Sequence, residues 1–346
     1  MARLLGSQQR RPRGAKYNAD TSNRDSVQNK IGRVTFGELV ENYRKKAFNK
    51  LGVTTQPITA HILDDYLLPR WGGKFALDIE PDDIEEWLDA LELENPTKEK
   101  IRRVMNVVYR RGQKSSLLPR TGDGNPVAFV TQSSKSNYKA VIVSPEQAFR
   151  IMMELGEPYR TLVFLVAVTG LRISEALGLQ WSDLDYERRM IHLRRVWVGN
   201  ELVPRMKTDG SAAPVPLGDL LADALQSWHR NTLYAKPDDW VFPSTKMKGK
   251  TPLSASMMAK GKIRPAATKI GIELKPGQRF GFHNFRHSLA TFLINKGKDL
   301  KTIQGLLRHA KSSTTLDLYS QAMDESKLAA QRDIAMAITG GQVQVN

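Results

Sequence analysis

Histidines and an arginine gather in one short stretch near the end of the chain, from Phe280 to Gln321. The stretch begins F-G-F-H-N-F-R-H and supplies His283, Arg286 and, further on, His309. A guanidinium stays charged and pairs two oxygens at once, and an imidazole exchanges protons near neutral pH. His283 and Arg286 are three positions apart, so a helix would place both on one face. These residue types predict a site that binds an oxyanion, such as a phosphate group, and moves a proton.

A second arginine, Arg172, lies far upstream in the segment T-G-L-R-I-S-E-A-L-G-L. It follows Gly170 at the start of a predicted helix, and a helix amino terminus presents free N–H groups to an anion. Two arginines suit the non-bridging oxygens of a phosphodiester, whose cleavage also needs a nucleophile and a proton donor. The chain has no cysteine, and the nucleophile candidate is Tyr319 in T-T-L-D-L-Y. Taken alone, this tyrosine fits a half-buried position on an ordinary helix better than it fits a nucleophile.

The spacing of His283 and His287 raises the alternative of a metal site, because His-x-x-x-His is a zinc-like pattern. The metalloprotease motif requires a glutamate directly after the first histidine, and Asn284 stands there. The chain has no cysteine ligand, and no acidic cluster lies nearby. We therefore expect no metal and no cofactor, and His287 is left without a chemical role.

The chain totals indicate the size of the protein and the charge of its partner. With 346 residues, two domains are expected. The formal net charge of +16 predicts a nucleic-acid partner, the alternative being a basic protein that merely stays soluble. The amino terminus has no apolar signal region, and the longest apolar run, Leu162–Val168, is too short for a membrane span. These features predict a cytoplasmic protein without a membrane partner.

The first half of the chain predicts a basic arm followed by a small helical domain. Residues 1–33 are polar and basic, which fits either a disordered tail or an arm that lies along DNA. Residues 34–117 show helical spacing of apolar positions, and one helix is expected over Thr59–Leu67, ending before Pro69. The last helix has a basic face that we expect to touch DNA, formed by Arg102, Arg103, Arg110 and Arg111.

A stretch without periodicity, residues 118–140, separates this domain from the rest of the chain and predicts an interdomain linker. Its basic residues Lys135 and Lys139 either cross a DNA backbone or remain solvated. A second domain is expected over residues 141–322, followed by a final amphipathic helix and a tail over 323–346. That last segment would dock either on a neighbouring copy or on its own domain.

The second domain begins with a helix-start signal, in which Ser144 precedes a proline and is followed three positions later by a glutamine. Further helices alternate with three short predicted strands. The strands are expected over Met190–Val196, Glu201–Lys207 and Ala213–Leu217. The helices are expected over about 159–168, 172–179, 220–228, 255–270, 283–295, 300–307 and 313–323. The predicted fold class is therefore mainly α with a small antiparallel β-sheet, an α+β domain.

The order of these motifs along the chain is more specific than any one of them. T-G-L-R-I-S-E-A-L-G-L, a lysine in a hairpin, H-N-F-R-H, L-R-H-A and T-T-L-D-L-Y follow one another. In this order the chain resembles a tyrosine recombinase of the phage-integrase family from about Thr35 to its carboxyl end. The resemblance implies a helical, SAM-like core-binding domain and a catalytic domain that together clamp double-stranded DNA. It also implies a tetramer on two DNA sites and leaves accessory DNA-bending or directionality proteins open.

The resemblance assigns roles to individual residues. Carried over by motif, the catalytic residues are Arg172, Lys207, His283, Arg286, His309 and the nucleophile Tyr319. Glu175 would orient the arginines or histidines rather than touch DNA. Lys207 lies in the least secure alignment, with Arg205 as its rival. Arg308 stands where the family usually has glycine, and it would either crowd the turn or add a phosphate contact.

The implied reaction is site-specific recombination without a metal. Tyr319 attacks a DNA phosphate, forms a 3′-phosphotyrosyl link and releases a 5′-hydroxyl. His283 helps to remove the tyrosine proton, Lys207 protonates the leaving oxygen, and the arginines stabilise the transition state. The alternatives are a type IB-like topoisomerase of the same chemistry and a non-catalytic DNA-binding protein on the same fold.

Overall fold

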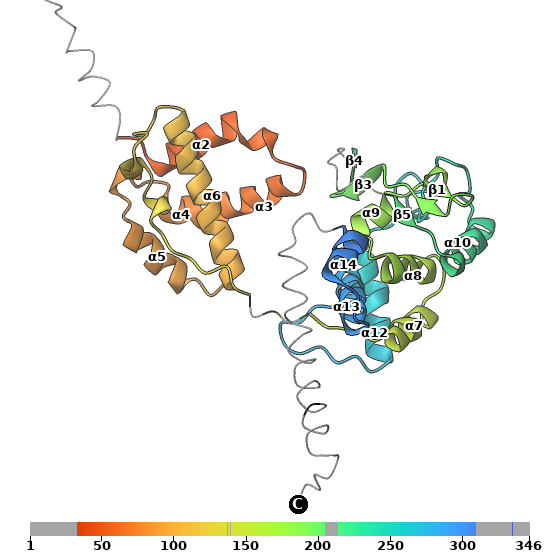
Figure 1. Cartoon of the computed structure of the whole chain (residues 1–346). Helices are drawn as coiled ribbons and strands as arrows, with labels where there is room; N and C mark the ends of the chain where they lie inside the picture. Colours follow the sequence, from red (N-terminus) through yellow and green to blue (C-terminus); the bar gives the residue numbers. More distant parts are fainter. Residues whose placement is uncertain (1–32, 137, 139, 205–213, 309–333, 335–346) are drawn as a thin grey trace, which may run out of the picture. The chain divides into compact units, whose positions relative to one another are not determined.

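The computed structural model describes residues 33–136, 138, 140–204, 214–308 and 334. It divides into two compact units, Met1–Ser136 and Asn137–Asn346, each with a hydrophobic core of its own (Figure 1). Apart from Arg33 and Ile334, the predicted amino-terminal arm (1–33) and carboxyl-terminal segment (323–346) lie outside the described residues. Among the described helices, none combines the length and the apolar character that crossing a bilayer requires.

The described part of the first unit is built from helices. They are α2 (Phe36–Lys46), η1 (Phe48–Lys50), α3 (Thr55–His61), the π-helical η2 (Ile62–Leu67), α4 (Leu68–Trp71), η3 (Ala76–Asp78), α5 (Pro81–Ala90), α6 (Asn95–Lys114), η4 (Gly122–Gly124) and η5 (Pro126–Ala128). The helix α2 packs against α6, where the rings of Phe36 and Tyr109 lie 5.7 Å apart. The buried Tyr109 hydroxyl donates to the Ala76 carbonyl at 2.8 Å, which satisfies its hydrogen bond inside the core.

The helix expected to end before Pro69 instead continues through it to Trp71, so that boundary was wrong. A proline lacks an N–H and its ring clashes with the carbonyl four residues earlier in a regular helix. Here the preceding turn is π-helical, and the N–H of Leu68 donates to Leu63, five residues back. The wider turn accommodates the ring. The same arrangement recurs in the second unit, where the π-helical η7 precedes Pro265.

The stretch predicted as a linker, 118–140, belongs to the first unit as far as Ser136. Leu118, Val127 and Val130 are buried in its core, so the description of this part as a linker was wrong. Sequence periodicity fails here because the apolar residues are held by short 3₁₀ turns rather than by a regular helix or strand.

The second unit is mainly helical with short antiparallel strands, which confirms the predicted fold class. Its helices are α7 (Pro145–Met153), α8 (Tyr159–Thr169), α9 (Ile173–Leu177), η6 (Trp181–Asp183), α10 (Asp219–Asn231), α11 (Ala255–Met258), the π-helical η7 (Ala259–Ile263), α12 (Arg264–Lys269), α13 (Phe282–Asn295) and α14 (Leu300–Leu307). The predicted capping box at Ser144 is confirmed, since this residue and Gln147 exchange hydrogen bonds. The apolar α8 contacts α7, α9, α10 and α13 and forms the centre of the unit.

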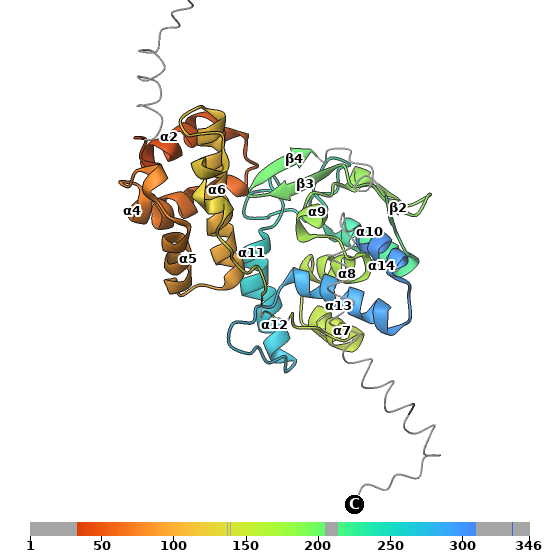
Figure 2. The same ribbon diagram turned by 60° about the vertical axis from the view of Figure 1, so that its left-hand side comes forward.

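The strands form two small antiparallel sheets. They are β1 (Leu184–Asp185), β2 (Met190–Ile191), β3 (Arg195–Val198), β4 (Glu201–Pro204) and β5 (Val215–Pro216), in the order β1-β2-β5 and as the hairpin β3-β4. Figure 2 shows the hairpin beside α9, which β3 contacts. The single strand predicted over Met190–Val196 is divided between the two sheets, because the chain leaves the first sheet after Ile191. There the Asp183 carboxylate holds Arg195 at 2.7 Å and fixes the start of the hairpin.

Candidate active site

The turn between α8 and α9 places the first predicted arginine. Gly170 ends α8 with φ +61°, and a Cβ atom there would lie 2.7 Å from the Leu307 side chain, so glycine meets both the backbone and the packing requirement. Arg172 follows as the N-cap of α9. Its side chain is 42% exposed, which leaves the guanidinium accessible to a ligand.

Glu175 holds Arg172 in place. Its Oε2 accepts from the Arg172 backbone N–H at 2.9 Å, and its Oε1 accepts from the Arg172 Nη1 at 3.1 Å. The Glu175 side chain is only 4% exposed, so this carboxylate is out of reach of a ligand. The position agrees with the expectation that Glu175 orients the arginines rather than touching DNA.

The second predicted arginine, Arg286, is buried on α13. It donates through Nη1 to the Gly170 carbonyl at the end of α8 and through Nη2 to the Leu307 carbonyl at the end of α14. Burial lowers the pKa of Arg286 to about 10, with Arg172 and Arg308 acting in the same direction and Glu175 in the opposite one. The guanidinium is therefore still charged at neutral pH.

Two histidines of α13 lie against each other one turn apart. The rings of His283 and His287 are 4.5 Å apart and nearly perpendicular. Burial lowers the pKa of His283, and the charges of Arg286 and Arg172 lower it further. Burial, His283 and Arg286 lower the pKa of His287 to about 4. Both imidazoles are thus neutral at pH 7, and His283 has the charge state that a proton acceptor needs.

Arg308 adds a guanidinium that the motif comparison left unexplained. It closes α14 in the left-handed conformation, and its side chain is 4% exposed. Its Nη2 donates to the Oε2 of Glu175 at 3.0 Å. A buried carboxylate receives the side chain, so the turn accommodates Arg308, and the expected phosphate contact stays a prediction.

The structure thus brings together Arg172, Glu175, His283 and Arg286, which come from α9 and α13. Two members of this site were not predicted from the sequence, His287 and the position of Arg308. The spacing of four from His283 was the only signal for His287. The predicted residues Lys139, Lys207, His309 and Tyr319 lie outside the described residues. Across the described ranges, no three acidic or histidine side chains converge as a metal ion would require.

The four arginines predicted to form the basic face of α6 differ in their exposure. Arg102 donates to both oxygens of Glu99, at 2.7 and 3.0 Å, and its side chain is only 20% exposed. This guanidinium is paired inside the unit and less exposed than its neighbours, and its contact with DNA stays a prediction. Arg103 is 69% exposed and Arg110 is also exposed, whereas Arg111 is half-buried. The exposed residue Lys135 lies near the end of the same unit.

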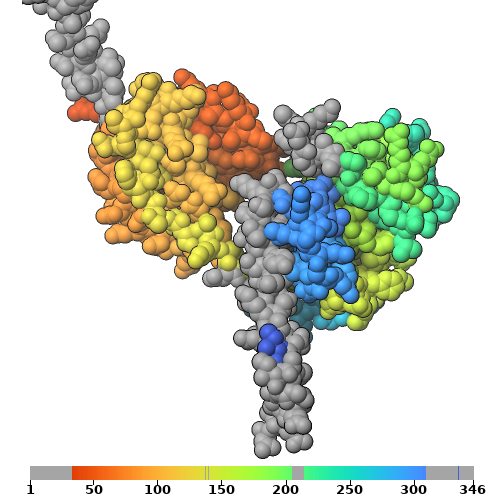
Figure 3. Space-filling view, in the orientation of Figure 1, coloured from red at the N-terminus to blue at the C-terminus, as the bar shows by residue number. Residues whose placement is uncertain are grey.

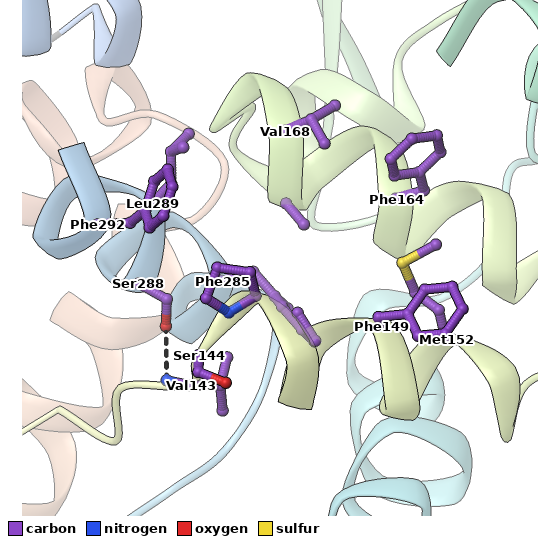
Figure 4. A pocket seen from close by; sticks show the side chains of 13 residues that line it. Val143, Ser144, Phe149, Met152, Phe164, Val168, Phe285, Ser288, Leu289 and Phe292 are labelled. Carbon is purple, nitrogen blue, oxygen red and sulfur yellow. Dashed lines mark hydrogen bonds between the residues drawn. The ribbon is translucent and has the colours of Figure 1, made fainter. Parts of the chain in front are cut away.

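The second unit also contains an apolar hollow, whose lining differs from that of the charged site. It has a volume of about 390 Å³ and lies between α7, α8 and α13, where Phe149 and Phe292 are partly exposed (Figure 4). No charged side chain lines this hollow, and the Ser288 Oγ accepts a hydrogen bond from the Val143 N–H at 2.9 Å. In Figure 3 the segment from α13 to α14, in blue, forms part of the surface of the second unit. The hollow is unsuited to binding a phosphate.

Arginines beside a neutral histidine on an α+β domain point to chemistry on a phosphodiester, and the comparisons with known proteins give its class. The model of the phage integrase family matches residues 142–326, more than half of the chain and wholly within the second unit. The chain therefore belongs to the phage integrase family.

Individual relatives match this chain at low sequence identity. The chain is 28% identical over 225 residues to a tyrosine recombinase XerC-like protein of Caldanaerobacter subterraneus subsp. tengcongensis, covering 58% of this chain and 55% of the relative. It is 31% identical over 163 residues to tyrosine recombinase XerC of Pediococcus pentosaceus, covering 45% of this chain and 47% of the relative. The matches thus span about half the length of these relatives.

Solved structures share the fold. A Tn1549 transposon integrase in complex with a circular intermediate DNA aligns with a TM-score of 0.69 at 19% identity, covering 85% of this chain and 99% of the other. A lambda integrase dimer bound to a COC′ core site aligns with a TM-score of 0.63 at 18% identity, covering 83% and 95%. At this identity the likeness establishes the fold.

Proposed function

We propose that this protein is a site-specific DNA recombinase that cuts and rejoins DNA through a 3′-phosphotyrosyl intermediate. The observation that carries the proposal is the placement of a neutral His283 within reach of the charges of Arg172 and Arg286, with Arg172 held by the buried Glu175. Two arginines in one site supply the positive charge that a phosphoryl transition state requires. The net charge of +16 and the membership of the phage integrase family support DNA as the substrate.

The proposed reaction exchanges one phosphoester for another. The Tyr319 oxygen forms a bond to phosphorus while the bond from phosphorus to the 5′-oxygen breaks. The tyrosine proton passes toward His283, since the pKa of an ordinary tyrosine is about 10 and the phenol needs a base at neutral pH. Lys207 protonates the 5′-oxygen, and His309 hydrogen-bonds the phosphate. The new ester conserves the bond energy, so a 5′-hydroxyl can reverse the step without another energy source.

Within this reaction the two arginines have different surroundings. Arg172 is accessible, and we assign it to a non-bridging oxygen that arrives with the DNA. Arg286 is fixed by two main-chain carbonyls before any ligand binds. Its remaining N–H groups are therefore oriented in advance, which is the arrangement that stabilises developing charge without reorganisation.

The test is covalent capture on a suicide DNA site that carries a nick near the cleavage position. The full-length protein should form a denaturant-resistant complex with the 3′ end of the DNA, and peptide mapping should find the link on Tyr319. Tyr319→Phe is the matched control, because it removes one oxygen. Capture of DNA by this variant, or no capture by the wild-type protein on DNA that it binds, would contradict the proposal.

A second arm of this experiment distinguishes recombination from relaxation of supercoils. We propose that the protein acts as a tetramer on two DNA sites; a lambda integrase tetramer has been solved on a Holliday junction. A pair of sites on labelled DNAs should then give exchanged strands and a four-protomer complex. Relaxation of a plasmid without strand exchange would instead indicate a topoisomerase.

We also propose that α6 contacts DNA through Arg103 and Arg110, which are exposed and two helical turns apart on one face. Replacing both with glutamine should weaken DNA binding and reduce the slope of log K against log salt by about 2, because each phosphate contact contributes about 0.9. The control is Lys46→Gln, an exposed residue at the end of α2. An unchanged slope in the double variant would remove α6 from the proposed interface.

A further inference from the structure

Arg308 occupies a position that is unfavourable for an arginine in two respects. Its backbone has φ +51°, in the left-handed region that glycine adopts most easily. Its side chain is 96% removed from solvent, with 4% exposed, although a guanidinium is rarely buried without partners. An arginine at this position is therefore expected to be held by specific interactions.

Those interactions connect two parts of the second unit that are distant in sequence. The Arg308 Nη2 donates to the Glu175 Oε2 at 3.0 Å, across 133 positions of sequence. The same carboxylate binds the side chain of Arg172 at 3.1 Å through its other oxygen. Glu175 is thus shared by one arginine that is buried and one that is accessible, and it joins the end of α14 to the start of α9.

The end of α14 is fixed from a second direction as well. The Leu307 carbonyl, directly before Arg308, accepts a hydrogen bond from Arg286 on α13. The chain leaves this point toward His309 and Tyr319. Consequently the two arginines Arg286 and Arg308 both act on the place from which the segment with the proposed nucleophile departs.

We infer that Arg308 is a positioning residue for the phosphoryl transfer: through Glu175 it fixes both the orientation of Arg172 and the end of α14. This inference rests on the proposed function. The guanidinium of Arg308 compensates part of the Glu175 charge, so that Arg172 is not drawn wholly to the carboxylate and keeps N–H groups for the phosphate. The contact that carries this effect is the hydrogen bond from the Arg308 Nη2 to the Glu175 carboxylate, made by a side chain that is 4% exposed.

The test compares Arg308→Gly and Arg308→Lys in full-length protein on the suicide DNA site. Glycine suits the left-handed backbone, so this variant removes the guanidinium without adding backbone strain. Its covalent complex should form about 100-fold more slowly, the effect expected when a reacting group is misplaced by about 1 Å. DNA affinity at low salt should stay within about twofold, since Glu175 holds the Arg308 guanidinium and exposed basic residues supply most of the affinity. Lysine restores the charge without the planar fork, so Arg308→Lys should form the covalent complex about tenfold faster than Arg308→Gly.

A double-mutant cycle with Glu175→Gln measures the coupling between Arg308 and Glu175 in the rate of covalent capture. If Arg308 acts through Glu175, the variant that carries both Arg308→Gly and Glu175→Gln should be no slower than Glu175→Gln alone, within about threefold. Thermal unfolding of each variant identifies loss of fold, and if Arg308→Gly unfolds, Arg308→Lys carries the comparison.

Several results would overturn the inference. They are an Arg308→Gly rate within threefold of wild type, an Arg308→Lys rate no better than that of the glycine variant, additive effects in the cycle, and DNA affinity that falls as much as the rate. The last result would make Arg308 a DNA ligand. Failure of the wild-type protein to capture DNA is a different outcome, because it refutes the proposed function and this inference together.

Discussion

Replacing Arg286 with alanine should slow the formation of the covalent DNA complex by about a thousandfold, the upper range for losing one donor to a developing oxyanion. The buried guanidinium is fixed by the carbonyls of Gly170 and Leu307 before DNA arrives, and water cannot reproduce a fixed positive charge at that place. DNA binding at low salt should change only a few fold, because most of the affinity comes from exposed basic residues.

The same substitution should also destabilise the second unit. Two carbonyl oxygens lose their partner, at a cost of about 1–3 kcal/mol for each group that stays buried and unpaired. Arg286→Lys is the informative companion, since an ammonium keeps the charge but lacks the planar fork that spans both carbonyls. Single-turnover capture, DNA affinity and urea unfolding should be measured together.

Arg150→Ala is the control for Arg286→Ala, since it removes an exposed arginine from α7 of the same unit. An Arg286→Ala protein that captures DNA within tenfold of the wild-type rate would show that this residue is not in the catalytic site. Loss of DNA affinity in parallel with the rate would show that it acts in binding instead.

Stability in acid should depend on His287. Its pKa is lowered from about 6.5 to about 4 in the folded protein, so the unfolded chain takes up the proton first as the pH falls. The stability contributed by the neutral form is therefore complete above pH 6.5 and is lost between 6.5 and 4. By linkage the loss amounts to up to about 3 kcal/mol, at about 1.4 kcal/mol for each pH unit.

His287→Leu should flatten this acid dependence, because the substitution removes the group that titrates. Among the described residues the His287 Nδ1 has no hydrogen-bond partner, so leucine sacrifices no hydrogen bond at that atom. Urea midpoints at several pH values between 7 and 4 provide the measurement, with His192→Gln as a control at a partly exposed histidine. An unchanged slope in His287→Leu would mean that other groups cause the acid dependence. The remaining slope includes His283, whose pKa is lowered in the same direction.

The parts of the site that were predictable from sequence are those set by local signals. A glycine before Arg172 and a histidine three positions before Arg286 indicated helix starts and a shared face, and the structure has both. The position of Arg308 was not predictable, because its partner lies 133 positions away and no spacing rule connects them. Only folding of the unit brings α14 to the start of α9.

The fold shows the same division between local and distant causes. The start of α7 followed from its capping box, whereas the boundary at Pro69 was wrong because a π-helical turn absorbs the ring. The low exposure of Arg102 was not predictable for a related reason. Its spacing of three from Glu99 was visible, but its burial depends on the segment around Val127, which packs on α6 and was taken for a linker.

The sharing of Glu175 by two arginines has a consequence for how such a protein can evolve. A residue with two essential neighbours cannot change without compensation at both, so this cluster should tolerate only coordinated replacements. On α6 a second buried carboxylate, Glu99, is likewise shared by Arg102 at 2.7 Å and Arg103 at 3.1 Å. The exposed Arg110, further along α6, is outside this pair of contacts. Single substitutions there can be sampled one at a time. Under the proposed function, new DNA targets would therefore be reached most easily through residues such as Arg110 in the helical unit, while the chemistry of the other unit stays constant.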